Sequence, residues 1–83
     1  MPKICKFPLK LTAQPEGGYT VTCPSVPELL TEGDTVEEAV QNVQDALKAV
    51  VELYEDTNRS LPAELLLDEV QSDIEFEYLT AAP

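Results

Sequence analysis

The chain has 83 residues and a formal net charge of −11 at pH 7, set by sixteen acidic and five basic side chains. This length has room for one hydrophobic core, so we expect a single domain over residues 1–83. The negative charge disfavours direct binding to nucleic acid and favours a basic protein partner, although it can also serve only to keep a small protein soluble. Because the sequence contains no histidine, it has no imidazole to act as a general base or metal ligand.

Nothing in the sequence predicts a membrane or secretory segment. No stretch approaches the roughly 18 uninterrupted apolar residues that span a bilayer. The first ten residues, MPKICKFPLK, lack an apolar block followed by a small-residue cleavage site. We therefore expect a cytoplasmic protein with no membrane partner.

Two short segments near the N-terminus have the alternation of β-strands. In residues 5–13 every second side chain is apolar, and the expected inward set is Cys5, Phe7, Leu9, Leu11 and Ala13. Residues 19–23 alternate in the same way. Residues 14–18 contain one proline and two glycines, so we expect a turn that closes an antiparallel hairpin. Pro8 cannot donate a hydrogen bond to a strand ladder, which indicates that the regular strand begins only there.

The expected register of this hairpin keeps the two cysteines apart. A five-residue loop would place Ala13 opposite Tyr19, Leu11 opposite Val21 and Leu9 opposite Cys23. Cys5 would then lie about 13 Å along the strand from the position facing Cys23. A disulfide needs Cα atoms within about 7 Å, so we predict two buried, reduced thiols. A redox pair or a metal site is the less favoured alternative.

The middle of the chain predicts a third strand over residues 28–32, followed by a long helix. Thr35 and Glu38 fit a capping box at the start of this helix, and Asn58 with Pro62 is typical of its end. The apolar residues recur every three or four positions, as in an amphipathic helix of about five or six turns. They are Val36, Ala39, Val40, Val43, Ala46, Leu47, Val50, Val51 and Tyr54.

The residues after the helix predict one further strand. Residues 63–72 fit a turn of helix and an extended connector equally well. Residues 73–79, DIEFEYL, alternate apolar and acidic side chains and predict the last strand. The fold class is then α+β: a three-stranded antiparallel meander, one long helix that covers one face of the sheet, and a final strand. If that strand lies parallel to the first, Lys6 and Lys10 would meet Glu75 and Glu77.

A set of residues between the hairpin and the helix carries a family resemblance. It consists of Gly17, Gly18, Tyr19, Pro24, Pro27, Gly33, Asp34, Thr35, Glu38 and Ala39. In this spacing, residues 4–60 resemble the HicB-like antitoxin family, whose N-terminal domain is a partial ribonuclease-H-like fold of three strands, a helix and a strand. These residues can all be explained as turn residues or as parts of a capped helix start, so none of them requires a ligand.

The resemblance implies that the chain is an antitoxin. Such antitoxins bind a small basic ribonuclease toxin of the HicA type and neutralise it by covering its active or RNA-binding surface. The acidic residues that would face such a partner are Glu28, Glu32, Glu37, Glu38, Glu75 and Glu77, with a merely solvated surface as the alternative at each. An open sheet face and a free strand edge also favour a homodimer or higher homo-oligomer.

Two features depart from the family pattern. Family members often carry Gly-Cys after the second proline, where this chain has Glu28 and Leu29. Many members also have a C-terminal DNA-binding module, which does not follow the last predicted strand here, so we expect no direct nucleic-acid partner. The alternative function is a free-standing interaction or regulatory module with the same fold and a different partner.

The residues favour a binding protein over an enzyme. Nucleases of the ribonuclease-H type hold divalent metal with carboxylates gathered from several elements, whereas the first strand offers Lys6 and Lys10. Asp73, Glu75 and Glu77 follow one strand face about 7 Å apart, which is typical of a solvated face. The serines have no histidine to activate them. We therefore expect no catalytic residue, no metal and no cofactor.

Overall fold

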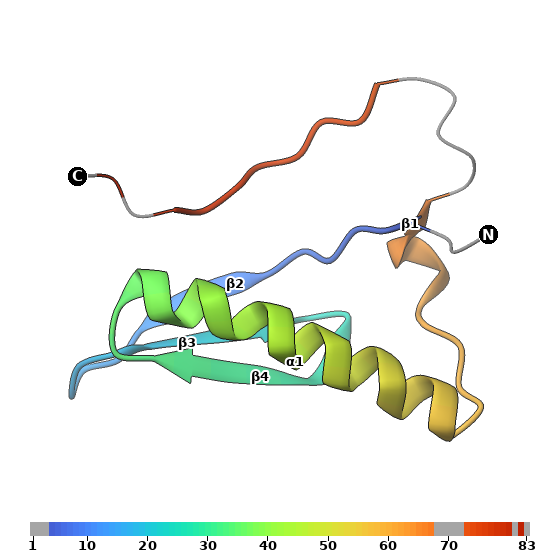
Figure 1. Ribbon diagram of the computed structural model, residues 1–83, viewed down its shortest axis with the longest axis horizontal. Helices are drawn as coiled ribbons and strands as arrows, with labels where there is room; N and C mark the ends of the chain where they lie inside the picture. Colours follow the sequence, from blue (N-terminus) through green and yellow to red (C-terminus); the bar gives the residue numbers. More distant parts are fainter. Residues whose placement is uncertain (1–3, 68–72, 81, 83) are drawn as a thin grey trace.

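A long helix lies across one face of a small antiparallel sheet in the computed structural model, which describes residues 4–67, 73–80 and 82 (Figure 1). The elements in chain order are β1 (Ile4–Cys5), β2 (Lys10–Ala13), β3 (Tyr19–Cys23), β4 (Val26–Gly33), α1 (Val36–Asp56), a 3₁₀ helix (Ala63–Leu65) and β5 (Leu66–Leu67). The sheet order is β2-β3-β4, with antiparallel neighbours. The predicted α+β class, with three strands, one helix and a final strand, is confirmed.

The hairpin of β2 and β3 has the predicted register. Leu11 pairs with Val21 and Ala13 pairs with Tyr19. The loop is closed by two backbone hydrogen bonds, one from Gln14 N to the carbonyl of Gly18 and one from Gly17 N to that of Gln14, both 3.0 Å. Gly17 and Gly18 have φ of 104° and 83°, a region that only glycine enters readily.

The predicted single strand over residues 5–13 is divided in two, and this part of the prediction is wrong. β1 ends at Cys5 and β2 begins at Lys10. Pro8 lies between them and has no N–H for a ladder, so the regular pairing with β3 starts after it. Leu9, expected opposite Cys23, lies outside the ladder, and Ala13 is exposed rather than inward.

The third strand is longer than the predicted residues 28–32, because β4 begins directly after a two-residue turn at Pro24 and Ser25. The pairing shifts register between Thr22 and Cys23, where a bulge brings Cys23 opposite Val26. Pro27 fits inside β4 because this strand is an edge of the three-stranded sheet, where a missing N–H is tolerated.

Helix α1 begins and ends where the sequence predicts. Thr35 is the N-cap, and its hydroxyl accepts a hydrogen bond from Glu38 N at 3.1 Å. Asn58, just after the C-cap Thr57, has φ of 55°, a left-handed conformation common after a helix end. The predicted apolar stripe faces the sheet, with Ala39, Val43, Val50 and Tyr54 buried and its other members half-buried.

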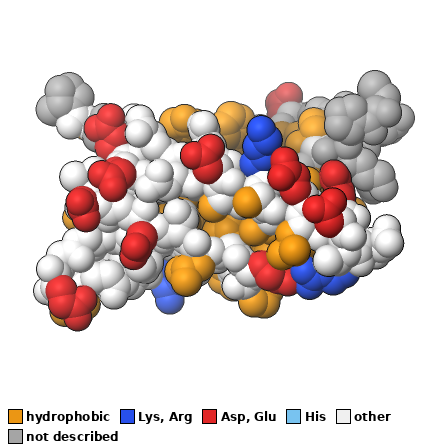
Figure 2. All heavy atoms as spheres, turned by 60° about the horizontal axis from the view of Figure 1, so that its bottom comes forward, with side chains coloured by type: hydrophobic (Ala, Val, Ile, Leu, Met, Phe, Trp, Pro, Cys, Tyr) orange, Lys and Arg blue, Asp and Glu red, His pale blue; other side chains and the backbone are white. Residues whose placement is uncertain are grey.

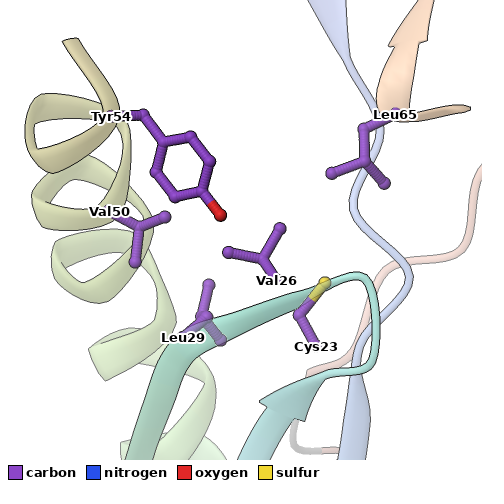
Figure 3. Packing of buried hydrophobic residues seen from close by; sticks show 6 residues of the cluster. All are labelled: Cys23, Val26, Leu29, Val50, Tyr54 and Leu65. Atoms are coloured by element: carbon purple, nitrogen blue, oxygen red, sulfur yellow. The ribbon is translucent and has the colours of Figure 1, made fainter. Parts of the chain in front are cut away.

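The core lies between α1 and the strands β3 and β4. Its larger cluster contains Cys23, Val26, Leu29, Val50, Tyr54 and Leu65, which converge from the two strands, the helix and the 3₁₀ turn (Figure 3). Val21, Ala39 and Val43 form a second cluster nearer the start of the helix. Leu29 is 1% exposed, and burial of such a side chain stabilises the fold by about 2–3 kcal/mol.

The chain after the helix differs most from the prediction. Residues 63–67 contain a 3₁₀ turn and then β5, which pairs antiparallel with β1 through Ile4 opposite Leu67. The rest of the ambiguous stretch, residues 68–72, lies outside the described residues. The final strand is therefore β5, and the prediction of a strand over residues 73–79 is wrong, since this segment is extended but in no assigned strand. It runs alongside the N-terminal segment, in the same direction as the chain from β1 to β2 (Figure 1).

Both cysteines carry free thiols, as predicted. Cys23 is buried in the core, whereas Cys5 is only half-buried in β1. The expectation of two buried thiols therefore holds for Cys23 alone.

Candidate partner-binding surface

A polar crevice of about 340 Å³ lies where the β2–β3 loop approaches the start of α1. Its lining residues are Gln14, Gly17, Gly18, Tyr19, Glu32, Gly33, Asp34, Glu38 and Asn42. Six of these belong to the set that carries the family resemblance, so residues spread over positions 17 to 38 of the chain meet at one place. We call this feature the polar crevice.

Close backbone approaches shape the polar crevice. A Cβ on Gly33 would overlap the backbone nitrogen of Ala39 and would lie 2.8 Å from its Cα. A Cβ on Gly18 would lie 3.2 Å from the carbonyl oxygen of Gly33. The loop, the end of β4 and the first turn of the helix therefore meet through backbone atoms, which glycine at positions 18 and 33 permits.

Hydrogen bonds hold the helix start against the sheet. Asn42 donates from Nδ2 to the carbonyl oxygen of Glu32 at 2.7 Å. In a capping box the carboxylate of the glutamate accepts a hydrogen bond from the backbone N–H of the N-cap residue. Here the Glu38 carboxylate instead accepts a long hydrogen bond, 3.4 Å, from the backbone N–H of Asp34, the residue before the N-cap. These contacts hold the backbone at Glu32 and Asp34 and the carboxylate of Glu38 around the crevice.

The lining of the polar crevice is chemically suited to a cationic group. Three carboxylates, those of Glu32, Asp34 and Glu38, line it together with the amides of Gln14 and Asn42. Carboxylates are strong acceptors for guanidinium and ammonium donors, and the positive end of α1 does not cancel three negative charges. Glu37, the residue before Glu38 on the helix, is exposed and is not among the lining residues.

Glu28 belongs to a different place, at the far end of the helix. Its carboxylate accepts hydrogen bonds from Arg59 Nη1 at 2.6 Å and from the Tyr54 hydroxyl at 2.9 Å. The Arg59 guanidinium carbon also lies 4.3 Å from the centroid of the Tyr54 ring, a cation–π distance. Glu28, one of the two positions that depart from the family pattern, thus joins β4 to the end of α1.

This network shifts the protonation of its members. The hydrogen bond from Arg59 is the main cause that lowers the pKa of Glu28 below its ordinary value of 4.5, with the Tyr54 hydroxyl adding to it. The pKa of Tyr54 is raised above its ordinary value of 10.0, first by the hydrogen bond to Glu28 and then by burial. Both shifts follow from a charge-assisted hydrogen bond that requires the carboxylate form of Glu28 and the phenol form of Tyr54.

The outer face of α1 extends the negative surface beyond the polar crevice. The helix carries six acidic side chains and one lysine, and all seven are exposed: Glu37, Glu38, Asp45, Lys48, Glu52, Glu55 and Asp56. In the view of the molecule in Figure 2, acidic side chains are spread across the whole width, and hydrophobic side chains are exposed in the middle. This surface complements a basic partner.

Glu75 and Glu77 lie away from the polar crevice, on the C-terminal segment. Lys6 donates from Nζ to the backbone carbonyl of Glu75 at 2.8 Å, instead of pairing with the carboxylate as the predicted strand arrangement would allow. Glu77 borders a second hollow, of about 550 Å³, which we call the apolar cleft. Its lining residues are Lys6, Phe7, Pro8, Leu9, Leu11, Val21, Val40, Val43, Gln44, Glu77, Tyr78 and Leu79.

The six acidic residues named from the sequence therefore occupy four places. The structure brings Glu32 and Glu38 to the polar crevice, leaves Glu37 exposed on the first turn of α1 outside the crevice lining, engages Glu28 with Arg59, and leaves two on the C-terminal segment. Sequence reasoning did not assign Gln14 or Asn42 to this surface. The position of Asn42, four residues after Glu38 on the helix, places it on the same side and could have indicated it.

Neither metal chemistry nor membrane insertion finds support in the residues that the structure describes. Among them, no three Cys, Asp or Glu side chains gather in a way that could hold a metal ion. No helix in this part of the chain combines the length and apolar character that a membrane span requires.

Comparison with protein families identifies the domain. A model of the HicB-like antitoxin of bacterial toxin–antitoxin systems matches residues 7–82, nearly the whole chain. The chain belongs to the HicB-like antitoxin family. The match extends past the motif residues and includes the C-terminal segment at 73–79.

The curated relatives include proteins named antitoxins and proteins named only as UPF0150 proteins. Antitoxin HicB of Escherichia coli strain K12 is 42% identical over 57 residues, which cover 69% of this chain and 41% of that protein. Antitoxin HicB 1 of Photorhabdus laumondii is 43% identical over 60 residues, or 72% of this chain and 39% of that protein. The chain thus spans about two fifths of the length of these antitoxins. A UPF0150 protein of Thermoplasma acidophilum is 32% identical over 57 residues, which cover 83% of its length.

Proposed function

We propose that this HicB-like domain binds and neutralises a small basic ribonuclease toxin of the HicA type by covering its active or RNA-binding surface. The observation that carries the proposal is the family match over residues 7–82, together with relatives that are named antitoxins. The role is one of binding, without catalysis, and it takes place in the cytoplasm.

The charge of the domain supports a basic partner. A net charge of −11 on 83 residues produces a negative potential over much of the surface, which speeds encounter with a basic protein and disfavours RNA. Bound acidic side chains would also compete with RNA phosphates for the same basic residues of the toxin. Neutralisation by occupation needs no chemistry beyond this competition.

Within that surface, the polar crevice is our proposed contact. Glu32, Asp34 and Glu38 are held in place by the backbone contacts of Gly33 and by the hydrogen bond of Asn42. A backbone that is fixed before binding needs little ordering when the partner binds, which favours affinity. Glu28 is already engaged by Arg59, so its role in toxin contact is secondary to joining β4 and α1.

Co-expression tests the proposal. The test first looks for a gene next to that of this chain that encodes a short, strongly basic protein, and a lone gene would count against the proposal. The basic protein is then expressed alone, with this chain, and with an unrelated acidic protein of similar size. We expect the basic protein to arrest growth, this chain to restore it, and the acidic control to have no effect. Growth arrest that persists with the chain present, despite comparable soluble expression, would contradict the proposal.

The second candidate is an interaction module with another partner. It is favoured by the UPF0150 relatives, of which the chain covers 83% in Thermoplasma acidophilum and 79% in a Synechocystis protein, because these names assign no toxin. Isolation of the tagged chain from its own cells separates the two candidates. A basic ribonuclease bound to it supports the antitoxin, whereas a stoichiometric partner of another class supports the module.

We also propose that the domain works as a homodimer or higher homo-oligomer. The described sheet has two edge strands, β2 and β4, and its face opposite α1 carries Leu30 at 66% exposure. Open edges and exposed apolar side chains are typical of surfaces that pair with another chain.

A further inference from the structure

The apolar cleft lies between the start of β2, the middle of α1 and the C-terminal segment. One wall consists of Leu11 and Val21 from the sheet with Val40 and Val43 from the helix. The outer edge of β2 borders the cleft, and in the described sheet this edge has no strand neighbour. An apolar wall next to an unpaired strand edge is the geometry that accepts an added β-strand.

The C-terminal segment has the sequence pattern of such a strand, but in the single chain it does not pair with another strand. Residues 73–79 alternate apolar and acidic side chains, yet they are in no assigned strand. Phe76 is 74% exposed and Tyr78 is 73% exposed. Two aromatic side chains with that exposure indicate a surface that is covered by another chain. Both belong to the segment that the family model includes.

The size of the exposed surface supports the same conclusion. The chain exposes 6646 Å², whereas a folded monomer of this mass exposes about 4,900 Å². Its radius of gyration is 14.1 Å, against about 12 Å for a compact domain of this length. Part of this excess comes from the extended segment at residues 73–79, whose side chains are exposed in the single chain.

The charges of the segment fit the edge of β2. Lys10 lies on the sheet face away from α1, because its neighbour Leu11 points toward the helix side. If Ile74, Phe76 and Tyr78 face the apolar cleft, the alternating acidic residues face the side of Lys10. Opposite charges on adjacent strands help to select this register.

We propose that two copies of the chain exchange residues 73–79, so that the segment of each copy docks in the apolar cleft of the other and extends its sheet beside β2. In the single chain the segment only borders its own cleft through Glu77, Tyr78 and Leu79 and leaves its aromatic side chains exposed. Reciprocal exchange about a two-fold axis covers both segments and both β2 edges at once. The inference deepens the proposed oligomeric state and does not depend on the toxin.

Isotope-filtered NMR on the full chain tests the exchange directly. Equal amounts of ¹³C,¹⁵N-labelled and unlabelled chains are unfolded, mixed and refolded, and their mass is measured by light scattering. We expect a dimer with intermolecular NOEs between the Tyr78 ring and the methyl groups of Leu11 or Val43. A monomer, or a dimer in which these NOEs are only intramolecular, would overturn the exchange.

Dimerisation of a matched pair of variants tests the exchange even if overlapping NMR signals hide the NOEs. The double variant Phe76→Glu, Tyr78→Glu places charge in the cleft and is expected to weaken dimerisation by at least about 100-fold. Leu53→Glu, at an exposed position near the end of α1 and outside the apolar cleft, is expected to change it by less than about 3-fold. Equal effects of the two changes, or a dimer unaffected by the double variant, would contradict the exchange.

The result is separable from the proposed function. If the double variant is monomeric but still restores growth in the toxin assay, the exchange is supported and toxin neutralisation does not require it. If the wild type is a monomer and still restores growth, the exchange is overturned while the proposed toxin neutralisation stands.

Discussion

Gly33, the last residue of β4, lies against Ala39 in the first turn of α1 so closely that a methyl group at position 33 would overlap the backbone nitrogen of Ala39. Ala39 is itself fully buried. This contact sets the distance between the sheet and the helix start and therefore positions the carboxylates of the polar crevice. A residue of the family motif thus acts through the backbone, with no ligand involved.

The first prediction follows from this contact. Gly33→Ala is expected to lower the free energy of unfolding by about 3 kcal/mol, because two backbones have to separate. Gly17→Ala serves as the control: its Cβ would meet nothing within 4 Å, and only the strain of a positive φ remains, about 1 kcal/mol. Urea unfolding followed by circular dichroism measures both. A loss for Gly33→Ala no larger than that for Gly17→Ala would show that the contact does not constrain the fold.

The second prediction concerns the start of α1. Thr35→Ala removes the hydroxyl that accepts from Glu38 N, and we expect it to destabilise the fold by about 1 kcal/mol. Thr35→Ser keeps the acceptor and is expected to remain within about 0.5 kcal/mol of the wild type. The same unfolding measurement applies, and equal losses in the two variants would argue against the cap.

The third prediction is a pH dependence from the Glu28 network. The pKa of Glu28 is below 4.5 in the folded chain, so its contribution to stability is present above pH 4.5 and is lost as the pH falls through the folded pKa. The pKa of Tyr54 is above 10.0, so its contribution is present below pH 10.0 and is lost as the pH rises through the folded pKa. The network therefore stabilises the fold fully between these two values.

Glu28→Gln tests this pH dependence. The difference in unfolding free energy between wild type and variant should be constant inside that window and should shrink at lower pH. An NMR titration of the tyrosine rings should also show the pKa of Tyr54 moving back toward 10.0. Glu52→Gln, on the exposed outer face of α1, is the control and should change neither quantity. An unchanged Tyr54 titration in Glu28→Gln would refute the proposed cause of the shift.

The fourth prediction locates the partner contact. The pair Glu32→Gln, Glu38→Gln removes two charges that line the polar crevice, and the pair Glu52→Gln, Glu55→Gln removes two at the far end of α1. Calorimetry with the basic partner should show about a 10-fold or greater loss of affinity for the first pair and less than about 2-fold for the second. Equal losses would mean that the total charge matters and the polar crevice does not.

Local signals explain which parts of the fold were predictable from sequence. The register of β2 with β3 followed from loop length and alternation, and the start of α1 followed from Thr35 and Glu38. The division of the first strand at Pro8 was only partly foreseen, because a missing N–H shows where pairing stops but not that residues 4–5 pair elsewhere. That pairing, with β5, depends on contacts more than 60 residues apart.

The candidate site was predictable in composition but not in arrangement. An acidic surface followed from the net charge, and the sequence named Glu32, Glu37 and Glu38. The engagement of Glu28 by Arg59, 31 residues away, could not be foreseen because it requires the helix end to lie beside β4. The alternation in residues 73–79 predicted a strand that the structure does not contain, because a strand also requires a partner edge, which the single chain does not supply to this segment.

RNA cleavage by the purified basic protein from the neighbouring gene tests the central claim most directly. The chain is titrated into the cleavage reaction, with the Glu32→Gln, Glu38→Gln pair as a comparison. We predict that wild-type chain abolishes cleavage near one equivalent per toxin and that the variant requires a clear excess. Cleavage that continues at full rate with an excess of correctly folded wild-type chain would contradict the account.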